Sequence, residues 1–362
     1  MANGYLLSRA LLKFQSESDD LLEELSAVAR TPDGYLWVGS DEFLTVERLT
    51  PMGNSTYGAH HTFHLKDYIN LHDEESEIDI EGLDYNDGYL WVVGSHSLKR
   101  NKPKGKKTQK DVARLAEIEH DPNRSLLARL PVFKGEILPT YADPEQEETL
   151  TAAALEHIDG HNILLEALAE DEHLGPFLAM RLPSKDNGFD IEGLAVNGNQ
   201  IFLGLRGPVL RGWAIVLEIQ VKAEKPGVLT LADLGDGELY RKHFLDLNGQ
   251  GIRELCLYGN DLLILAGPTM ALSGAMQLFR LADALAHSED TLWSQESGRL
   301  TPLFDLPFTI GADNAEGLAL VPCLGEETAL MVVYDSPHPR RRVSPESIYA
   351  DIFQLPELSS AD

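Results

Sequence analysis

One short motif returns along the chain and constrains the fold more than any other feature. The sequence DIEGL occupies residues 79–83 and again 190–194, and NAEGL occupies residues 314–318. Two weaker copies lie at 24–40 and 251–268. Self-similarity at intervals of this kind is typical of folds built from tandem structural units. The chain is therefore expected to repeat one small unit several times.

Each copy has the pattern of a β-hairpin. A polar or acidic residue precedes a short apolar strand, a turn follows, and a second strand rich in Leu, Val, Ile and Trp returns. The turns at 86–88 (NDG) and 197–199 (NGN) contain the residues that tight hairpins prefer. Two further strands are expected after most copies, for example at 214–221 and 242–247. Four antiparallel strands per unit, repeated in tandem, predict an all-β fold and a single β-propeller domain over residues 1–362.

The spacing of the copies sets the number of blades. With one register residue per copy, the intervals are 55, 111, 61 and 63 residues. The long interval accommodates either two blades or one blade with an insertion. We favour five blades of four antiparallel strands, and six blades is the alternative. The register residues are Ser26, Glu81, Glu192, Arg253 and Glu316.

The long interval is expected to contain a helical insertion at about 140–172. Residues 143–146 (DPEQ) have the pattern of a helix N-terminus, and apolar residues between 150 and 168 keep helical spacing. Residues 125–132 and 177–183 are then expected to be the third and fourth strands of the second blade.

The two ends of the chain complement each other. Three strands are expected from residue 316 onward, ending at 347–355, while residues 8–14 remain unassigned near the N-terminus. We expect this N-terminal strand to close the last blade, because an open ring would leave edge strands exposed.

The geometry of a propeller predicts where the repeated acids lie. The loop that leads into a first strand and the loop that leaves the second strand lie on one face, at the mouth of the central channel. The acids of several blades therefore converge there. The residues before or within the first strands are Asp79, Glu81, Asp190, Glu192, Asp313, Asn314 and Glu316, and those after the second strands are Asp41, Glu42, His96, Arg206 and Asp335.

Converging carboxylates have two interpretations. Without a cation they would repel one another or hold protons at raised pKa, whereas Ca²⁺ accepts six to eight oxygen ligands. The first hypothesis is a divalent-cation site, most plausibly for Ca²⁺. Its metal ligands would be Glu81, Glu192, Glu316, Asp190 and Asp79. The alternative is structural, with carboxylates that accept hydrogen bonds from neighbouring loops and hold blades together.

Basic residues are concentrated in three loops of the same face. They lie at 99–110, at Arg206 and Arg211, and at Arg340–Arg342. In a chain with formal net charge −28, a basic rim around an acidic funnel suits a small anionic ligand, such as a phosphate or carboxylate ester. The segment 101–110 has the alternative interpretation of a solubilising lysine loop.

Composition excludes several classes of protein. The negative charge disfavours nucleic-acid binding and binding to anionic membranes. No apolar run has the length of a membrane span, and no secretory signal is evident. The only two cysteines, Cys256 and Cys323, argue against a disulfide scaffold. A cytoplasmic location is the expectation.

The motifs also carry a resemblance. DIEGL followed by LWVVGSHSLKR (90–100), and DIEGLAV (190–196) with LGLRGPV (203–209), resemble an uncharacterised bacterial β-propeller family, a domain of unknown function. This resemblance implies the fold and no established activity. More distantly, the short repeat is similar to esterase-like and phytase-like propellers, which implies calcium-dependent phosphoester hydrolysis. Two copies depart from the acidic pattern, at 24–26 and 251–253.

Two hypotheses of function follow. In the first, the protein is a metal-dependent hydrolase of an anionic ester, in which a metal-bound water attacks while Arg206, His96 and Lys99 steer or stabilise the anion. In the second, the protein is a non-catalytic propeller that binds a ligand or a protein partner through the same face. The sequence does not decide the oligomeric state.

Overall fold

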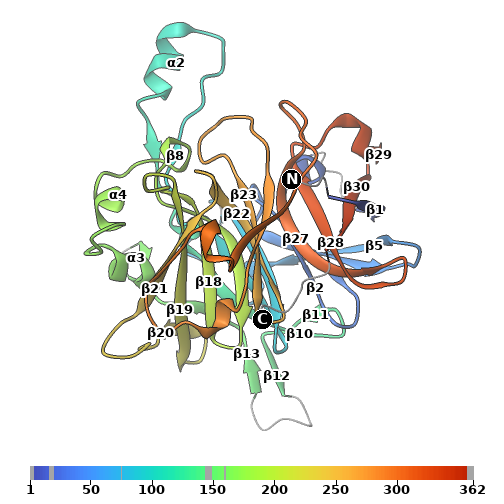
Figure 1. The fold of residues 1–362 in the computed structure, drawn as a ribbon, viewed down its shortest axis with the longest axis horizontal. Helices are drawn as coiled ribbons and strands as arrows, with labels where there is room; N and C mark the ends of the chain where they lie inside the picture. Colours follow the sequence, from blue (N-terminus) through green and yellow to red (C-terminus); the bar gives the residue numbers. More distant parts are fainter. Residues whose placement is uncertain (1–3, 16–19, 75, 143–148, 159, 357–362) are drawn as a thin grey trace.

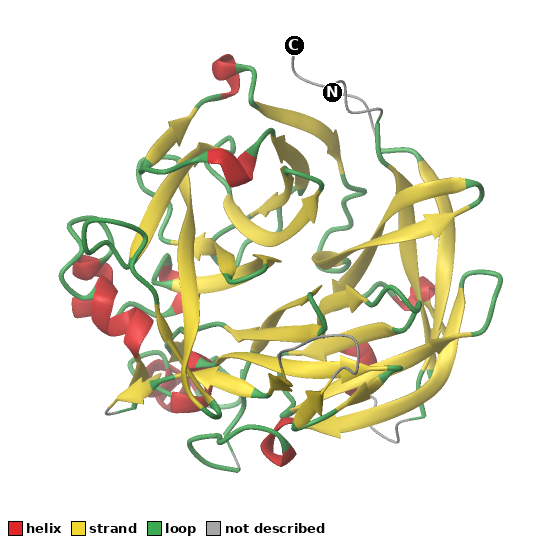
Figure 2. Ribbon diagram, turned by 90° about the horizontal axis from the view of Figure 1, so that it is seen from below, coloured by secondary structure: helices red, strands yellow, loops and turns green. Residues whose placement is uncertain are grey.

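The protein folds into β-sheets arranged around a common centre (Figure 1, Figure 2). The structure is a computed structural model and describes residues 4–15, 20–74, 76–142, 149–158 and 160–356. The all-β fold predicted from the repeat is confirmed. Among the described residues, no helix is long and apolar enough to cross a membrane.

Each copy of the repeat begins a unit of four strands. The first unit contains β2 (Leu25–Arg30), β3 (Leu36–Ser40), β4 (Thr45–Pro51) and β5 (Thr56–His64). The second contains β6 (Ile80–Asn86), β7 (Tyr89–Gly94), β10 (Leu127–Phe133) and β14 (Ala153–Leu155). The third contains β17 (Asp190–Asn197), β18 (Gln200–Gly207), β19 (Trp213–Lys225) and β21 (Tyr240–Asp246).

The remaining two units follow the same order. The fourth contains β22 (Gly251–Tyr258), β23 (Asp261–Gly267), β24 (Gln277–Leu281) and β26 (Leu300–Asp305). The last contains β27 (Asn314–Cys323), β28 (Glu326–Asp335), β30 (Ser347–Gln354) and β1 (Leu6–Lys13). Because β1 pairs antiparallel with β30, the first strand of the chain lies beside the last.

The first strands of the units form a closed cycle of contacts. Strand β2 packs beside β6, β6 beside β17, β17 beside β22, β22 beside β27, and β27 beside β2. Buried apolar side chains fill the space between neighbouring units, with Trp37 between the first and second and Trp91 between the second and third. The hydrophobic core is therefore divided among the interfaces around the ring.

Parallel pairing joins three pairs of neighbouring units; one of the three is the pairing of β21 with β25 (Thr291–Trp293), the short strand between β24 and β26. Strand β1 pairs with β5, and β14 pairs with β20 (Val228–Leu231), which extends from the end of β19. These contacts supply hydrogen-bond partners to strands that would otherwise be open edges.

Shorter elements decorate the ring. Strands β8 (Lys99–Arg100) and β9 (Ile118–Glu119) carry α2 (Thr108–Arg114), which projects away from the sheets (Figure 1). The opposite end carries the hairpin of β12 (Thr140–Ala142) and β13 (Thr149–Thr151). The other short strands are β11 (Glu136–Ile137), β15 (His157–Ile158), β16 (His161–Asn162), β25 (Thr291–Trp293) and β29 (Arg342–Ser344).

The prediction of a helical insertion at 140–172 is wrong for most of its length. Residues 149–151 and 153–155 are strands, and the helical part is α3 (Ile163–Leu168). The expected helix N-terminus at 143–146 lies outside the described residues. Residues 177–183 are not the fourth strand, because α4 (Gly175–Ala179) occupies that segment and β14 takes the place beside β10.

The remaining helices are short. They are α1 (Asp20–Glu23) and the 3-10 helices η1 (Leu65–Asp67), η2 (Pro122–Ser125), η3 (Ser184–Asp186), η4 (Ala284–Ala286), η5 (Gln295–Ser297) and η6 (Pro339–Arg341). Two of them bear on the sites described below, since η2 supplies Arg124 and η6 supplies Arg341.

Candidate functional site at the channel mouth

The register residues of the repeat share one local distortion. In every first strand, the pairing with the second strand shifts at or beside the register residue. Such a β-bulge leaves a residue unpaired and re-aims its side chain. The bulges therefore turn equivalent side chains away from the regular ladder at the same level of the ring. These residues are Ser26, Glu81, Glu192, Arg253 and Glu316.

The glycine after the bulge allows neighbouring first strands to approach closely. A Cβ atom on Gly82 would lie 2.6 Å from the Cβ of Leu194, and one on Gly317 would lie 2.9 Å from the backbone nitrogen of Val28. Gly193 has equally little space. A side chain at these positions would force the inner strands apart, so the repeated glycine has a structural role.

Two buried arginines bridge the acids on one side of the channel mouth. Arg206 lies 2.6 Å from Asp190, measured from Nη2 to Oδ2, and also pairs with Glu192. Arg253 lies 2.9 Å from the other oxygen of Glu192, measured from Nη1 to Oε2, and pairs with Glu316. All five side chains are almost fully buried. Glu192 is therefore clamped between two guanidinium groups.

A third arginine, Arg124, pairs with the acids at the start of the second unit. Arg124, from η2, lies 2.6 Å from Asp79, measured from Nη1 to Oδ2, and pairs with Glu77. Glu77 in turn binds Lys99, with 2.6 Å between Oε1 and Nζ. The channel mouth thus carries alternating positive and negative side chains rather than carboxylates alone.

Glu81 stands among these groups without an ion pair of its own. Within the described part of the chain, its side chain makes no hydrogen bond or salt bridge, and it is partly exposed. Burial among protein atoms, followed by the negative charges of Glu192 and Asp79, raises the pKa of Glu81 well above its ordinary value. All three arginines interact electrostatically with Glu81, which places it centrally.

Two more carboxyl groups of this region have raised pKa values, Asp41 directly after the second strand β3 and Asp190 at the start of the first strand β17. Burial, together with the charges of Asp79, Asp335 and Glu24, raises the pKa of Asp41 to about 8. Burial raises the pKa of Asp190 to about 7 despite the opposing charge of Arg206. Acids outnumber guanidinium groups here, so protons or a cation must balance the excess at neutral pH.

The structure brings together the three glutamates that the repeat singled out. Burial raises the pKa of Glu316, with Arg253 opposing the shift, and Glu192 and Asp41 are among the charges that act on it. The described residues contain no group of three or more His, Cys, Asp or Glu side chains placed to hold a metal ion. The calcium prediction and its ligand set stay predictions.

Comparison of the sequence with protein families gives one decisive match. A family model described as a protein of unknown function, DUF3616, matches residues 24–351. The chain belongs to the DUF3616 family. No curated protein matches it significantly in sequence.

Solved structures similar to this DUF3616 chain are β-propeller-like proteins of low identity. Virginiamycin B lyase from Staphylococcus aureus is 10% identical with a TM-score of 0.36, covering 96% of this chain and 100% of its own. A putative oxidoreductase (glucose dehydrogenase) from Thermus thermophilus is 14% identical, with a TM-score of 0.39 and coverage of 96% and 100%. A gluconolactonase from Xanthomonas campestris is 11% identical, with a TM-score of 0.37 and coverage of 97% and 87%. At these values the likenesses carry no argument about function.

His96 occupies a different place from the one that the hydrolase hypothesis assumes. Its Nδ1 lies 2.8 Å from the carbonyl oxygen of Gly94, and its Nε2 lies 2.6 Å from Nδ2 of Asn162. Burial lowers the pKa of His96 to about 4, so the ring is neutral. Asn162 also caps α3 by accepting hydrogen bonds from two backbone N–H groups. His96 therefore fastens α3 to the second unit, and within the described residues its ring forms no hydrogen bond or ion pair with the acids above.

The other basic residues that were predicted to form a rim lie in different environments. Arg206 is buried in the cluster, and Lys99 is half exposed at its margin. The lysines between 102 and 110 are exposed, on the segment before α2 and, for Lys110, in α2 itself, which projects from the ring (Figure 1). Asp313 pairs with Arg341, 2.7 Å from Oδ1 to Nε, and so belongs to another hollow described below.

Three residues of the cluster, Glu77, Arg124 and Arg253, were not predicted as site residues from the sequence. Arg253 is visible in the sequence as the register residue that stands where three other copies have glutamate, and this position is the signal that could have identified it. Arg124 belongs to a short 3-10 helix outside the repeat, and no pattern in the sequence indicates that it reaches the channel mouth.

Proposed function

We propose that the protein is a five-bladed propeller, each blade beginning with one of the five first strands, and that its channel mouth hydrolyses a small anionic ester. The site would be the cluster around Glu81, with Arg206 and Arg253 on one side and Arg124 on the other. The substrate class is a phosphate or carboxylate ester small enough to enter this cluster.

One observation carries the proposal. The Nε–H groups of Arg124, Arg206 and Arg253 are buried without a hydrogen-bond partner among the described residues, and Glu81 in the same cluster has no ion pair. Buried donors without partners are costly unless a water or a ligand satisfies them. Unsatisfied guanidinium donors and a carboxyl group without an ion pair, in one cluster, are groups that the oxygen atoms of an ester would complete.

The chemistry follows from the protonation state of Glu81. Because the pKa of Glu81 is raised well above its ordinary value, its carboxyl group holds a proton to higher pH than an ordinary glutamate does, and the protonated form can donate to the leaving-group oxygen of the ester. The guanidinium groups would stabilise the negative charge that develops on the attacked carbonyl or phosphoryl group. Water attacks, the ester bond breaks as the leaving oxygen takes the proton of Glu81, and the proton that the water loses passes to the Glu81 carboxylate; the acid and the alcohol then leave.

The excess of carboxylates favours a divalent cation as a second candidate. A cation such as Ca²⁺ near Glu81 would neutralise that excess, lower the raised pKa values and polarise the ester in place of a proton. In that case Glu81 would be a ligand of the cation instead of a proton donor.

The test is a panel of chromogenic phosphate, carboxylate and lactone esters, assayed with EDTA and with added Ca²⁺, Mg²⁺ or Mn²⁺. Glu81→Gln removes the proton donor, and Glu238→Gln, at an exposed surface site, is the matched control. We expect turnover that Glu81→Gln lowers by about a hundredfold or more and Glu238→Gln leaves unchanged.

The outcomes separate the candidates. Turnover that survives EDTA supports proton transfer by Glu81, whereas turnover that EDTA abolishes and Ca²⁺ restores supports the cation. Absence of turnover across the whole panel would refute both and favour a non-catalytic propeller that binds a ligand or a protein partner at this face.

A further inference from the structure

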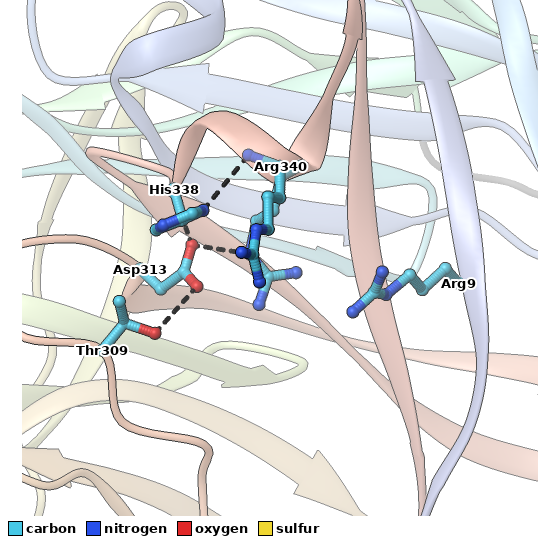
Figure 3. Close-up of a pocket in the computed structure, with 6 residues that line it drawn as sticks. Arg9, Thr309, Asp313, His338 and Arg340 are labelled. Carbon is cyan, nitrogen blue, oxygen red and sulfur yellow. Dashed lines mark hydrogen bonds and ion pairs between the residues drawn. The ribbon is translucent and has the colours of Figure 1, made fainter.

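A second hollow lies in the last unit, outside the carboxylate cluster. It has a volume of about 260 Å³ and lies between β1, the loop before β27 and η6 (Figure 3). Three of its lining residues are arginines, in a chain with formal net charge −28. Its walls are formed by Arg9, Thr309, Asp313, His338, Arg340 and Arg341.

Arg341 is fixed at the base of the hollow. Its Nε lies 2.7 Å from Oδ1 of Asp313, its Nη2 lies 2.7 Å from Oδ2 of Asp351, and its guanidinium stacks over the ring of Tyr334 at 3.7 Å. The residue is only 6% exposed. Its remaining terminal nitrogen, Nη1, is buried and has no hydrogen-bond partner among the described residues. Arg341, which lines the hollow, therefore keeps one buried, charged donor without a partner among the described residues.

The other two arginines face the same space from different elements. Arg9 extends from β1 toward the group formed by Asp313, His338 and Arg340 (Figure 3), while its Nε binds Asp351 at 3.0 Å. Arg340 is exposed, and its guanidinium forms no ion pair within the described part of the chain. Two carboxylates thus face three guanidinium groups, and one positive charge remains uncompensated.

His338 contributes a further donor. Its Nδ1 accepts a hydrogen bond from the backbone N–H of Arg340 at 3.2 Å. The proton of the neutral ring is therefore on Nε2. The hydroxyl of Thr309 lies 3.3 Å from Asp313 at the opposite wall.

We propose that this hollow binds the phosphate group of a small phosphate monoester. A phosphate group is tetrahedral and carries a charge of about −1.5 to −2 at neutral pH, so it can accept hydrogen bonds from donors on several sides at once. Arg9 approaches from one side and Arg340 and Arg341 from the other, which suits that shape better than a planar carboxylate does. The volume admits the phosphate with a small organic part.

This inference stands apart from the proposed hydrolysis. None of the residues that line the hollow pairs with Glu81, Glu192 or Arg206, and the phosphate site requires no chemistry at the channel mouth. Failure of one proposal leaves the other intact, because inorganic phosphate has no ester bond and its binding is measured without turnover.

The experiment is calorimetric titration of the full chain with inorganic phosphate and with phenyl phosphate, at constant ionic strength. Acetate and sulfate are the comparison anions. The variant Arg340→Gln removes an exposed guanidinium without breaking an ion pair, and Arg9→Gln removes the donor on the opposite side. The matched control is Arg299→Gln, an exposed arginine of the fourth unit that changes the net charge equally.

We expect phenyl phosphate to bind with a dissociation constant of about 1 mM or tighter. Loss of one charged donor should weaken binding about tenfold in Arg340→Gln and in Arg9→Gln, and by less than about twofold in Arg299→Gln. Phosphate should also raise the melting temperature of the wild type more than that of Arg340→Gln.

Three results would overturn the proposal. The first is no binding of phosphate or phenyl phosphate by the wild type. The second is equal weakening of phenyl phosphate binding in Arg340→Gln and Arg299→Gln, which indicates a general charge effect. The third is binding of acetate as tight as that of phosphate. Melting curves identify any variant that fails to fold, and the two variants on opposite sides of the hollow each test the site independently.

Discussion

Asp41→Asn is expected to stabilise the protein in a strongly pH-dependent way. Burial and neighbouring acids raise the pKa of Asp41 from 3.8 to about 8 in the folded protein. The folded state then binds a proton that the unfolded state releases, so stability is present at low pH and lost as pH rises toward 8. Asparagine cannot ionise and should remove this loss.

The magnitude follows from the interval over which the two states differ. Between pH 5 and pH 8, a window of about three pH units, Asp41 is protonated in the folded state and ionised in the unfolded state. At about 1.4 kcal/mol per unit, the loss of stability over this window is at most about 4 kcal/mol. Asp41 is partly exposed, and water screens part of this energy. We therefore expect Asp41→Asn to gain about 1–2 kcal/mol over the wild type as pH rises from 5 to 9.

Urea unfolding at pH 5, 6, 7, 8 and 9 measures the free energy of unfolding of both proteins. Asp87→Asn, in an exposed hairpin turn, removes the same charge and should give a difference that is constant with pH. The reasoning fails if the Asp41→Asn difference is independent of pH or larger at pH 5 than at pH 9. Added Ca²⁺ should flatten the wild-type dependence only if the channel mouth binds the cation.

Three further changes test other parts of the structure. Arg253→Gln leaves two buried carboxylates without their shared partner and should lower the free energy of unfolding by about 3–5 kcal/mol, measured in urea. Deletion of residues 1–13 removes β1 and exposes the edge of β30, so the shortened chain should melt earlier and aggregate at concentrations where the full chain is soluble. His96 should stay neutral in NMR titration down to about pH 5. Because its pKa is lowered on folding, the stability that it contributes is complete above pH 6.5 and lost as pH falls toward 4, and Asn162→Ala should shift that loss.

The hairpins could be predicted because their signal is local. The turn at 86–88 places Asp87 and Gly88 at φ angles of 48° and 83°, and Asp and Gly are residues that tolerate this left-handed region. Apolar strands on both sides then determine the pairing. The repeat also identified the bulged glutamates, because the following glycine is required where the next inner strand approaches.

The insertion could not be predicted in the same way. The spacing of apolar residues from 150 onward fits a helix, yet Ala153 and Leu155 are buried in a strand that pairs with β10. Strand β10 offers an open edge that only the folded ring reveals, and pairing with it outweighs local helix preference. The local spacing of apolar residues indicates whether a segment prefers helix or strand, but it does not indicate the strand with which that segment will pair.

Arg253 shows most clearly how one position in a repeat sets the chemistry of the whole ring. At the five equivalent bulges, Glu192 and Glu316 flank Arg253 and both pair with it, whereas Glu81 lies between Glu192 and Ser26. The Ser26 hydroxyl donates its hydrogen bond to the backbone carbonyl of Ile80 and carries no charge.

A regular ring of glutamates would be equally acidic everywhere and would favour a metal at its axis. The substitution of arginine at one position and serine at another makes the ring asymmetric, with its charge compensated beside the fourth unit and uncompensated at Glu81. Because Glu81 has no cation on either side within its own ring, the excess proton or a bound ion is expected there first, which is why Glu81→Gln is the decisive variant for the chemistry of the channel mouth.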